Sequence, residues 1–164
     1  TDGKPISLSE SGRHPIHVLE SFLQSVATTS EDQSKADRIL RIADFLYGAS
    51  AMDAAVAVLD NAEKSISRIR SQPTGRSAYL VKGSPSGRTK TAETYFCVVA
   101  GTTYCSCRSY FERCKSDPKA LCKHLLALKL MPHLNVNCNQ EIVTDERYAT
   151  VLMERVFDKD GENF

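Results

Sequence analysis

Apolar residues recur at helical spacing through the first third of the chain. Residues 15–28 and 36–47 each carry them at about every third or fourth position, which is the pattern of an amphipathic helix. Gly48 follows the second run, and glycine readily adopts the left-handed conformation that ends helices. The alanine-rich run 52–59 predicts a third helix, with Ser50 as its N-cap. We expect its small side chains to pack inside the protein rather than to contact a partner.

The pattern changes from helical spacing to strand-like runs near residue 64. Three runs are rich in β-branched and aromatic residues, as strands are: 65–71, 77–82 and 94–99. The sequence Pro73-Thr74-Gly75 is a turn signal between the first two runs. Residues 145–157 return to helical spacing, with Thr144 as a candidate N-cap. The predicted fold class is therefore α+β, with N-terminal helices, a small antiparallel sheet and a C-terminal helix.

Composition places the chain among ordinary globular proteins. Its 164 residues are 41% hydrophobic and 25% charged, which suits a single domain. It has no run of about eighteen apolar residues, so the sequence predicts no membrane span. No signal peptide is visible, and the six cysteines suit a reducing compartment better than a secreted one.

Charge is distributed very unevenly, although the net charge is only +1. Residues 64–129 contain thirteen basic and three acidic residues, which gives +10, whereas residues 1–63 carry −5 and residues 130–164 carry −4. Such a basic block is typical of a surface that meets a phosphate backbone. The aromatic residues within it are candidates for stacking on unpaired bases: Tyr79, Tyr95, Tyr104, Tyr110 and Phe111. Pairing with the acidic helices, and packing of the rings in the core, explain the same residues equally well.

Four potential metal ligands stand in a tight pattern within the basic block. Cys105, Cys107, Cys122 and His124 form Cys-x-Cys, fourteen intervening residues and Cys-x-His. Three thiolates and one imidazole complete a structural zinc site and leave no coordination position for a substrate. We therefore predict one structural Zn²⁺ and no enzymatic activity. Residues two apart on a helix diverge by about 200°, so the second pair can reach one ion only if the regular helix starts at or just after Cys122.

The other cysteines and histidines fit the metal pattern less well. Cys114 lies between the two pairs and is the alternative ligand. Cys97 alternates within a strand-like run and is interpreted as a core residue. Cys138 has no partner in sequence, and neither it nor Cys114 has the positioned base that a catalytic nucleophile needs. The remaining histidines are scattered and are interpreted as solvated or partly packed: His14, His17 and His133.

The pattern of the four ligands resembles the SWIM-type zinc finger, and Ala127 is the small residue that such fingers often carry three places after the histidine. Three flanking runs are similar to the small SWIM proteins of the Shu-complex family. They are the run FLYGASAMDAAVAVLD (45–60), the hairpin sequence SQPTGRSAYLVKG (71–83) and the closing run VTDERYATVLMERVF (143–157). The resemblance covers residues 36–157, while residues before 34 fit it loosely and the insert at 83–93 departs from shorter members.

The resemblance and the predicted elements together imply one compact domain built around a zinc-stapled ββα SWIM finger. Its expected segments are an N-terminal tail and helix (1–34), a helical hairpin (35–63), antiparallel strands (64–104), the SWIM zinc finger (105–131), and a C-terminal helix and tail (132–164).

The resemblance also implies a function and a partner. It implies a non-enzymatic, nuclear subunit of a Shu-type complex that joins a RecA-like recombinase paralogue and supports recombinase filaments on single-stranded DNA in homologous recombination repair. DNA contact would run through the partner or through the basic region 64–129, and no small-molecule substrate is expected. Candidate partner surfaces are the exposed side of the helices within 45–59 and the helix 125–130. The alternative is an autonomous DNA-binding SWIM module, as in transposase-associated proteins. A module of a ubiquitin ligase is a third setting, against which the lack of a second, RING-type zinc motif counts.

Overall fold

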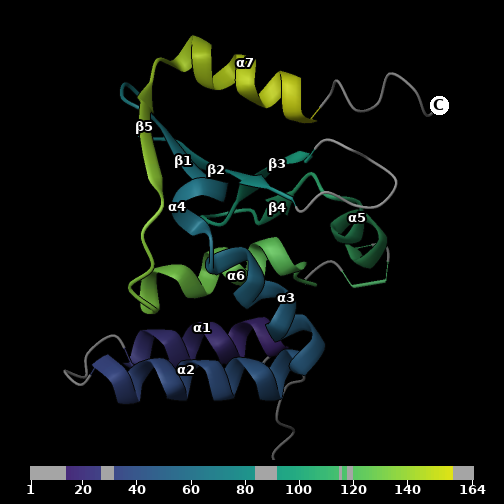
Figure 1. The fold of residues 1–164 in the computed structure, drawn as a ribbon. Coiled ribbons are helices and arrows are strands. Elements are labelled where there is room, and N and C mark those ends of the chain that lie inside the picture. The colour runs from purple at the N-terminus through teal and green to yellow at the C-terminus, as the bar shows by residue number, and fades with distance from the viewer. Residues whose placement is uncertain (1–13, 27–31, 84–91, 115, 118–119, 157–164) are drawn as a thin grey trace, which may run out of the picture.

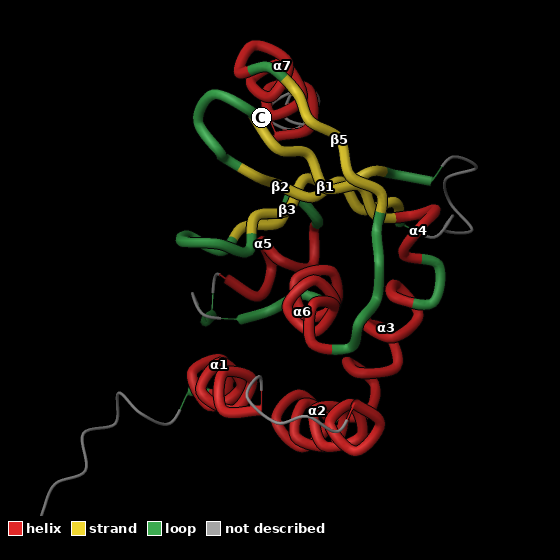
Figure 2. The backbone as a smooth tube through the Cα atoms, turned by 90° about the vertical axis from the view of Figure 1, so that its left-hand side faces the viewer, coloured by secondary structure: helices red, strands yellow, loops and turns green. Residues whose placement is uncertain are grey.

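The computed structural model describes these parts of the chain: residues 14–26, 32–83, 92–114, 116–117 and 120–156. They form stacked layers (Figure 1 and Figure 2). Helix α7 (Asp145–Val156) covers one face of a five-stranded sheet. On the other face lie α3 (Ala49–Leu59), α4 (Ala62–Ser65) and α6 (Lys123–Leu130). Helices α1 (Pro15–Val26) and α2 (Asp32–Tyr47) lie side by side beyond them as an outer pair.

The three N-terminal helices follow the predicted apolar spacing. Along α1 the buried residues recur every three or four positions: Ile16, Leu19, Leu23 and Val26. Helix α2 ends at Gly48, whose φ of 83° is a conformation that only glycine adopts without strain. Helix α3 begins directly after this glycine, so the prediction of Ser50 as N-cap is wrong, and Ser50 lies inside the helix. Helix α3 packs against α6, as expected for an internal role of its small side chains.

The sheet has the strand order β4-β3-β2-β1-β5. Strands β1 (Ile66–Ser71), β2 (Ser77–Lys82) and β3 (Thr94–Val98) match the predicted runs and pair antiparallel. A two-residue strand, β4 (Tyr104–Cys105), extends the antiparallel part. Strand β5 (Asn139–Val143) was not predicted and pairs parallel with β1 at the sheet edge. Only Val143 of this strand is buried, so its sequence needs no alternation of apolar and polar residues and shows none.

Two hydrophobic clusters hold the layers together. The smaller lies between the sheet and α7, and it contains Ile69, Ala78, Phe96 and Val151. The larger lies between the other sheet face and the remaining helices, with α6 near its centre. Four leucines of α6 are at most 2% exposed, namely Leu125, Leu126, Leu128 and Leu130. The prediction that residues 125–130 offer a partner surface is therefore wrong, because all of them except Lys129 are buried within the protein.

Helix α7 closes the fold as its sequence predicts. The Arg147 N–H donates to Thr144 Oγ1 at 3.2 Å, so Thr144 is the N-cap. In the first turn, the Asp145 carboxylate accepts hydrogen bonds from the hydroxyls of Ser71 and Thr74, which ties α7 to the turn between β1 and β2. Three short helices were not predicted: α4, where residue 65 was expected to begin a strand, α5 (Arg108–Cys114) and the 3-10 turn Met131–His133. No helix within the described parts of the chain has the length and apolarity needed to cross a membrane.

Candidate metal centre

The four predicted ligands come from three neighbouring elements and meet in one buried cluster. Cys105 ends β4, Cys107 precedes α5, and Cys122 and His124 stand at the start of α6. Their candidate donor atoms all lie within 4.8 Å of one another. All four side chains are at most 3% exposed. A dry cluster of three sulfurs and one imidazole is the donor set of a closed tetrahedral zinc site.

The backbone explains how each pair converges. Ser106 N–H donates to the Phe96 carbonyl at 3.0 Å, and the Phe96 N–H donates to Ser106 Oγ at 2.9 Å. These two bonds hold Ser106 opposite Phe96 just beyond the end of β4, so the side chains on either side of Ser106, Cys105 and Cys107, point to the same face. Cys122 has extended φ and ψ of −82° and 168°, and its carbonyl accepts the first helical bond, from Leu126 N–H at 3.0 Å. The prediction that the helix starts just after Cys122 is confirmed.

Electrostatics within the cluster favour a cation. The pKa of Cys107 lies far below its ordinary value, because the thiols of Cys105 and Cys122 donate hydrogen bonds to its thiolate. The same contacts raise the pKa of those two donor thiols: Cys105 chiefly through Cys107, and Cys122 chiefly through Cys105. The three sulfurs are thus hydrogen-bonded to one another, and the negative charge is favoured on Cys107. A dication would displace the remaining protons and satisfy three thiolates at once.

The imidazole of His124 completes the set with suitable spacing. Its Nδ1 lies 3.8 Å from Cys105 Sγ. Zn–S and Zn–N bonds of about 2.3 and 2.0 Å place sulfur and nitrogen about 3.6 Å apart at two corners of a tetrahedron. The ring stacks on Tyr95, with centroids 4.6 Å apart and planes tilted by 34°. Burial, and secondarily Glu93, raises the pKa of Tyr95 to about 12, so that ring stays neutral beside the sulfurs.

Other predicted candidates lie elsewhere or play structural parts. Cys114 ends α5, and its side chain is outside the described residues. Cys97 is fully buried, as its interpretation as a core residue requires, and its Sγ lies 3.4 Å from Cys105 Sγ. Cys138 is half-buried, and burial raises its pKa. The scattered histidines make surface contacts: His14 Nε2 lies 3.0 Å from Asp117 Oδ2, and His17 pairs with Glu20 at 4.0 Å.

The aromatic residues of the basic region make contacts within the chain. Besides Tyr95, the guanidinium of Arg68 lies 5.9 Å from the centre of the Tyr79 ring. The rings of Tyr104, Tyr110 and Phe111 contact one another edge to face at 5.8 to 6.1 Å. Of the five rings, Phe111 alone belongs to the exposed large hydrophobic side chains, at 50% exposure. Packing therefore explains most of this group without a bound base.

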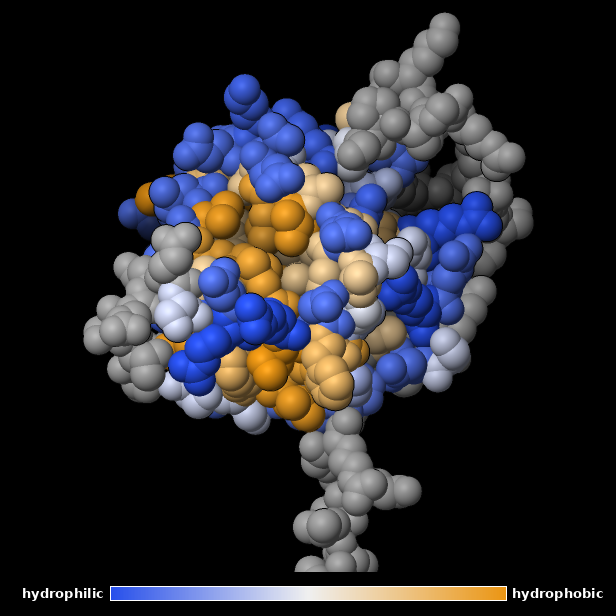
Figure 3. Space-filling view, turned by 60° about the horizontal axis from the view of Figure 1, so that its bottom comes forward, coloured by the Kyte–Doolittle hydropathy of each residue, from blue (hydrophilic) through white to orange (hydrophobic). Residues whose placement is uncertain are grey.

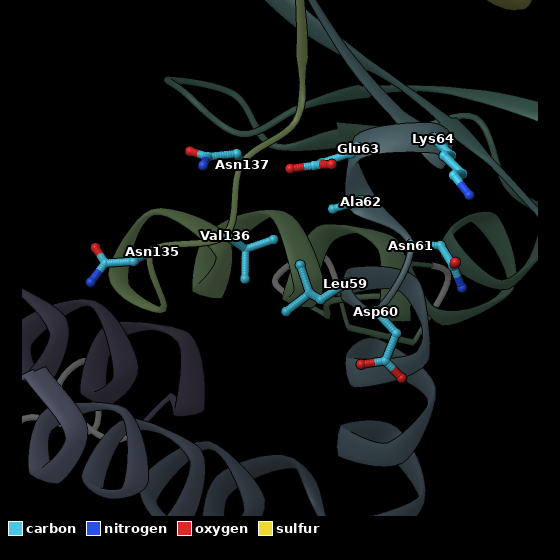
Figure 4. A pocket seen from close by; sticks show the side chains of 9 residues that line it. All are labelled: Leu59, Asp60, Asn61, Ala62, Glu63, Lys64, Asn135, Val136 and Asn137. Atoms are coloured by element: carbon cyan, nitrogen blue, oxygen red, sulfur yellow. The ribbon is translucent and has the colours of Figure 1, made fainter.

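A separate open pocket of about 420 Å³ lies between α4 and the segment after the 3-10 turn (Figure 4). Its lining includes no predicted metal ligand: Leu59, Asp60, Asn61, Ala62, Glu63, Lys64, Asn135, Val136 and Asn137. Leu59 and Val136 approach each other across its floor, whereas the side chains of Asn61 and Lys64 point away from it (Figure 4). The charged side chains that line it are all exposed, so we assign no ligand to this pocket.

Comparison with known proteins gives two similar relatives. The chain is 36% identical over 139 residues to "Zinc finger SWIM domain-containing protein 7" of Mus musculus. The aligned residues cover 84% of each of the two chains. It is 33% identical over 138 residues to the protein of the same name from Homo sapiens, over 83% of this chain and 90% of that one. No family model and no solved structure matches the chain.

Proposed function

We propose a function from the family of this chain, which belongs to the SWIM zinc finger family of "Zinc finger SWIM domain-containing protein 7". Its resemblance to Shu-complex SWIM proteins predicts this family. The protein is a non-enzymatic, zinc-stabilised subunit of a recombination complex. It pairs with a RecA-like recombinase paralogue in the nucleus and supports recombinase filaments on single-stranded DNA in homologous recombination repair. One structural Zn²⁺ per chain is held by Cys105, Cys107, Cys122 and His124.

The observation that carries this proposal is the buried Cys3His cluster. Its four side chains join the end of β4 to the first turn of α6, so a bound zinc would fix the finger against the sheet. A fully occupied tetrahedral site leaves no position for water or substrate. The metal therefore supplies folding energy and shape, and the recombinase paralogue supplies any nucleotide chemistry.

The exposed side of the α1 and α2 pair is the surface that we propose for the partner. Phe45 on α2 is 85% exposed and Val18 on α1 is 39% exposed, although both are large apolar residues. Figure 3 looks toward this end of the molecule and shows hydrophobic side chains gathered between charged ones. A contiguous apolar area with a polar rim is typical of a protein interface. Helix α6 is excluded from this role by its burial.

Co-expression with RecA-like recombinase paralogues tests the proposal directly. The expected result is a stable hetero-complex with one zinc per chain, measured by co-purification and metal analysis. A solitary, folded, zinc-bound monomer with every paralogue would contradict the partner assignment and leave the zinc assignment intact. A stable complex without zinc would contradict the metal assignment instead.

Two matched substitutions locate the interface. Phe45→Ser should weaken the hetero-complex by about thirtyfold or more, because an exposed aromatic anchor contributes roughly 2 kcal/mol or more at an interface. Met153→Ser is the control, since Met153 is 55% exposed on α7 at the opposite end of the molecule. Equal affinity of the two variants would place the partner elsewhere.

A second candidate function rests on the charge of residues 64–129. Arg70 and Arg76 are exposed there, and the Arg108 side chain is 91% exposed. These cations favour an autonomous DNA-binding module. Its affinity for single-stranded DNA would fall steeply as salt rises from about 50 to 200 mM. A partner-dependent factor would bind poorly when alone at either salt concentration.

A further inference from the structure

The thiol of Cys97 lies against the metal centre without belonging to either ligand pair. Its Sγ is 3.4 Å from that of Cys105, and both side chains are fully buried. A free cysteine can fill a core as a small hydrophobe. This one, however, directs its sulfur at the sulfur of a predicted zinc ligand rather than at apolar atoms alone.

The strand register places the two cysteines opposite each other. Cys97 of β3 pairs with Cys105 of β4. The next pair, Phe96 and Ser106, carries the backbone hydrogen bond, so the cysteines form a non-hydrogen-bonded antiparallel pair. Such pairs have Cα atoms about 4.5 Å apart, which falls inside the range of about 4.4 to 6.8 Å seen in disulfides. The two sulfurs can therefore be joined without rearranging β3 or β4.

We propose that Cys97 and Cys105 form a reversible disulfide in the presence of a hydroperoxide, and that this disulfide removes Cys105 from the zinc site. The inference rests on the zinc site of the proposed function, and it adds a modification site beyond that function. After oxidation, Cys107, Cys122 and His124 remain as an incomplete ligand set. Zinc leaves, and the finger stays open until the disulfide is reduced.

The chemistry balances with a hydroperoxide as the oxidant. The Cys105 sulfur attacks one peroxide oxygen as its thiol proton is lost, the O–O bond breaks, and Cys105 becomes a sulfenic acid while water or an alcohol leaves. The Cys97 sulfur then attacks the Cys105 sulfur and displaces its hydroxyl as water, with the thiol proton of Cys97. The two sulfurs together lose two electrons, which reduce the peroxide.

Burial determines when this reaction occurs. Both sulfurs are inaccessible in the closed finger, and buried cysteines are inert toward oxidants. The segment between Cys105 and Cys122 must open first, which exposes Cys105 at the end of the two-residue strand β4. The disulfide between Cys105 and Cys97, which lies on the longer strand β3, then keeps the segment open. Zinc-loaded protein should accordingly react more slowly than chelator-treated protein.

Peptide mapping after a hydrogen peroxide pulse tests the proposal on the full chain. Zinc content is measured before the pulse, after the pulse and after reduction with dithiothreitol. Wild type should lose zinc, yield a peptide linked through Cys97 and Cys105, and regain zinc on reduction. Cys138→Ser is the matched control, because Cys138 is a half-buried cysteine outside the metal cluster, and it should behave as wild type does.

Cys97→Ser retains all four predicted ligands, so it should bind zinc normally before oxidation. After the pulse it should accumulate sulfinic acid at Cys105 and fail to regain zinc on reduction. Cys97→Ala serves the same purpose if the serine variant folds poorly. The proposal is overturned by a wild-type linkage between Cys107 and Cys122, by no linkage at all, or by full zinc recovery in both Cys97 variants. Absence of zinc before the pulse would instead contradict the proposed function.

Discussion

Removal of zinc is predicted to open the segment between Cys105 and Cys122 while the rest of the domain stays folded. Little packing holds this segment. Among its described residues, Leu121 is the one buried apolar side chain outside the ligands, and most of α5 is exposed. We therefore expect its described residues to depend on a metal that joins Cys105 and Cys107 to Cys122 and His124.

The free energy that zinc contributes can be estimated from the donor set. Structural zinc sites bind with apparent free energies of about 10 to 16 kcal/mol at neutral pH. At about 1 μM free zinc, that affinity stabilises the bound form by roughly 2 to 8 kcal/mol. Most of this range exceeds the roughly 1.5 to 3 kcal/mol that burial of a single leucine such as Leu121 contributes.

Helix α6 is stabilised mainly by burial of its side chains, although Cys122 and His124 at its start are two of the predicted ligands. Its leucines Leu125, Leu126, Leu128 and Leu130 are at most 2% exposed. Burial of four such side chains contributes about 6 to 12 kcal/mol, an upper estimate whose range lies above most of the zinc contribution. Helix α6 should therefore stay packed against α3 and the sheet when zinc is removed.

Hydrogen exchange followed by mass spectrometry measures both outcomes at once. A chelator should raise exchange in peptides from 106–121 and leave α6, β1, β2 and α7 protected. His124→Ala should show the same exchange pattern with or without chelator. Global loss of protection would show that the zinc term dominates the core, and an unchanged 106–121 segment would show that no metal holds it.

Four further results are expected. Leu126→Ala should lower the free energy of unfolding in urea by about 2 to 5 kcal/mol, whereas Val18→Ala, at an exposed position, should change it by less than about 0.5 kcal/mol. Thr144→Ala should cost about 1 kcal/mol in the same assay, because it removes the N-cap of α7. Hydrogen bonds from Ser71 and Thr74 hold the pKa of Asp145 below its usual range. The ionised Asp145 carboxylate therefore stabilises the fold at pH values above its unfolded-state pKa, and this stabilisation is lost as pH falls through its folded-state pKa. Asp145→Asn should thus flatten the dependence of stability on pH below about pH 4. Zinc affinity should fall as pH falls, since protons compete for the Cys105 and Cys122 thiols, whose pKa values are raised, and a colorimetric zinc indicator would register the release.

The sequence predicted most elements because their apolar periodicity is local. Helix α1 buries Ile16, Leu19, Leu23 and Val26 at regular helical spacing, and β2 occupies the predicted run. Strand β5 could not be found in this way. Its residues Asn139 to Ile142 are exposed at the sheet edge, so nothing in their order of polar and apolar side chains marks a strand. Its parallel pairing with β1 is set by the path of the chain after α6.

The burial of α6 shows how two predictions made for one segment can conflict. The run after His124 is apolar almost throughout and predicts a buried helix, and α6 buries every residue of it except Lys129. Assigning the same helix to a partner surface required a free face, which that composition excludes. The exposed Phe45 carries the opposite signal, but its solvent exposure becomes visible only when the faces of α2 are placed against α1 and the core.

The pairing of Cys97 with Cys105 follows from the position of the turn between their two strands. Cys97 and Cys105 lie equally far from Gly101, four residues on either side. Gly101 has a φ of 70°, a conformation that favours glycine and is typical of a tight connection between strands. A hairpin centred on that residue necessarily pairs Cys97 with Cys105, which is the pairing found. The ligand spacing alone predicts the four candidate zinc ligands, whereas the turn glycine determines which fifth residue lies beside one of them.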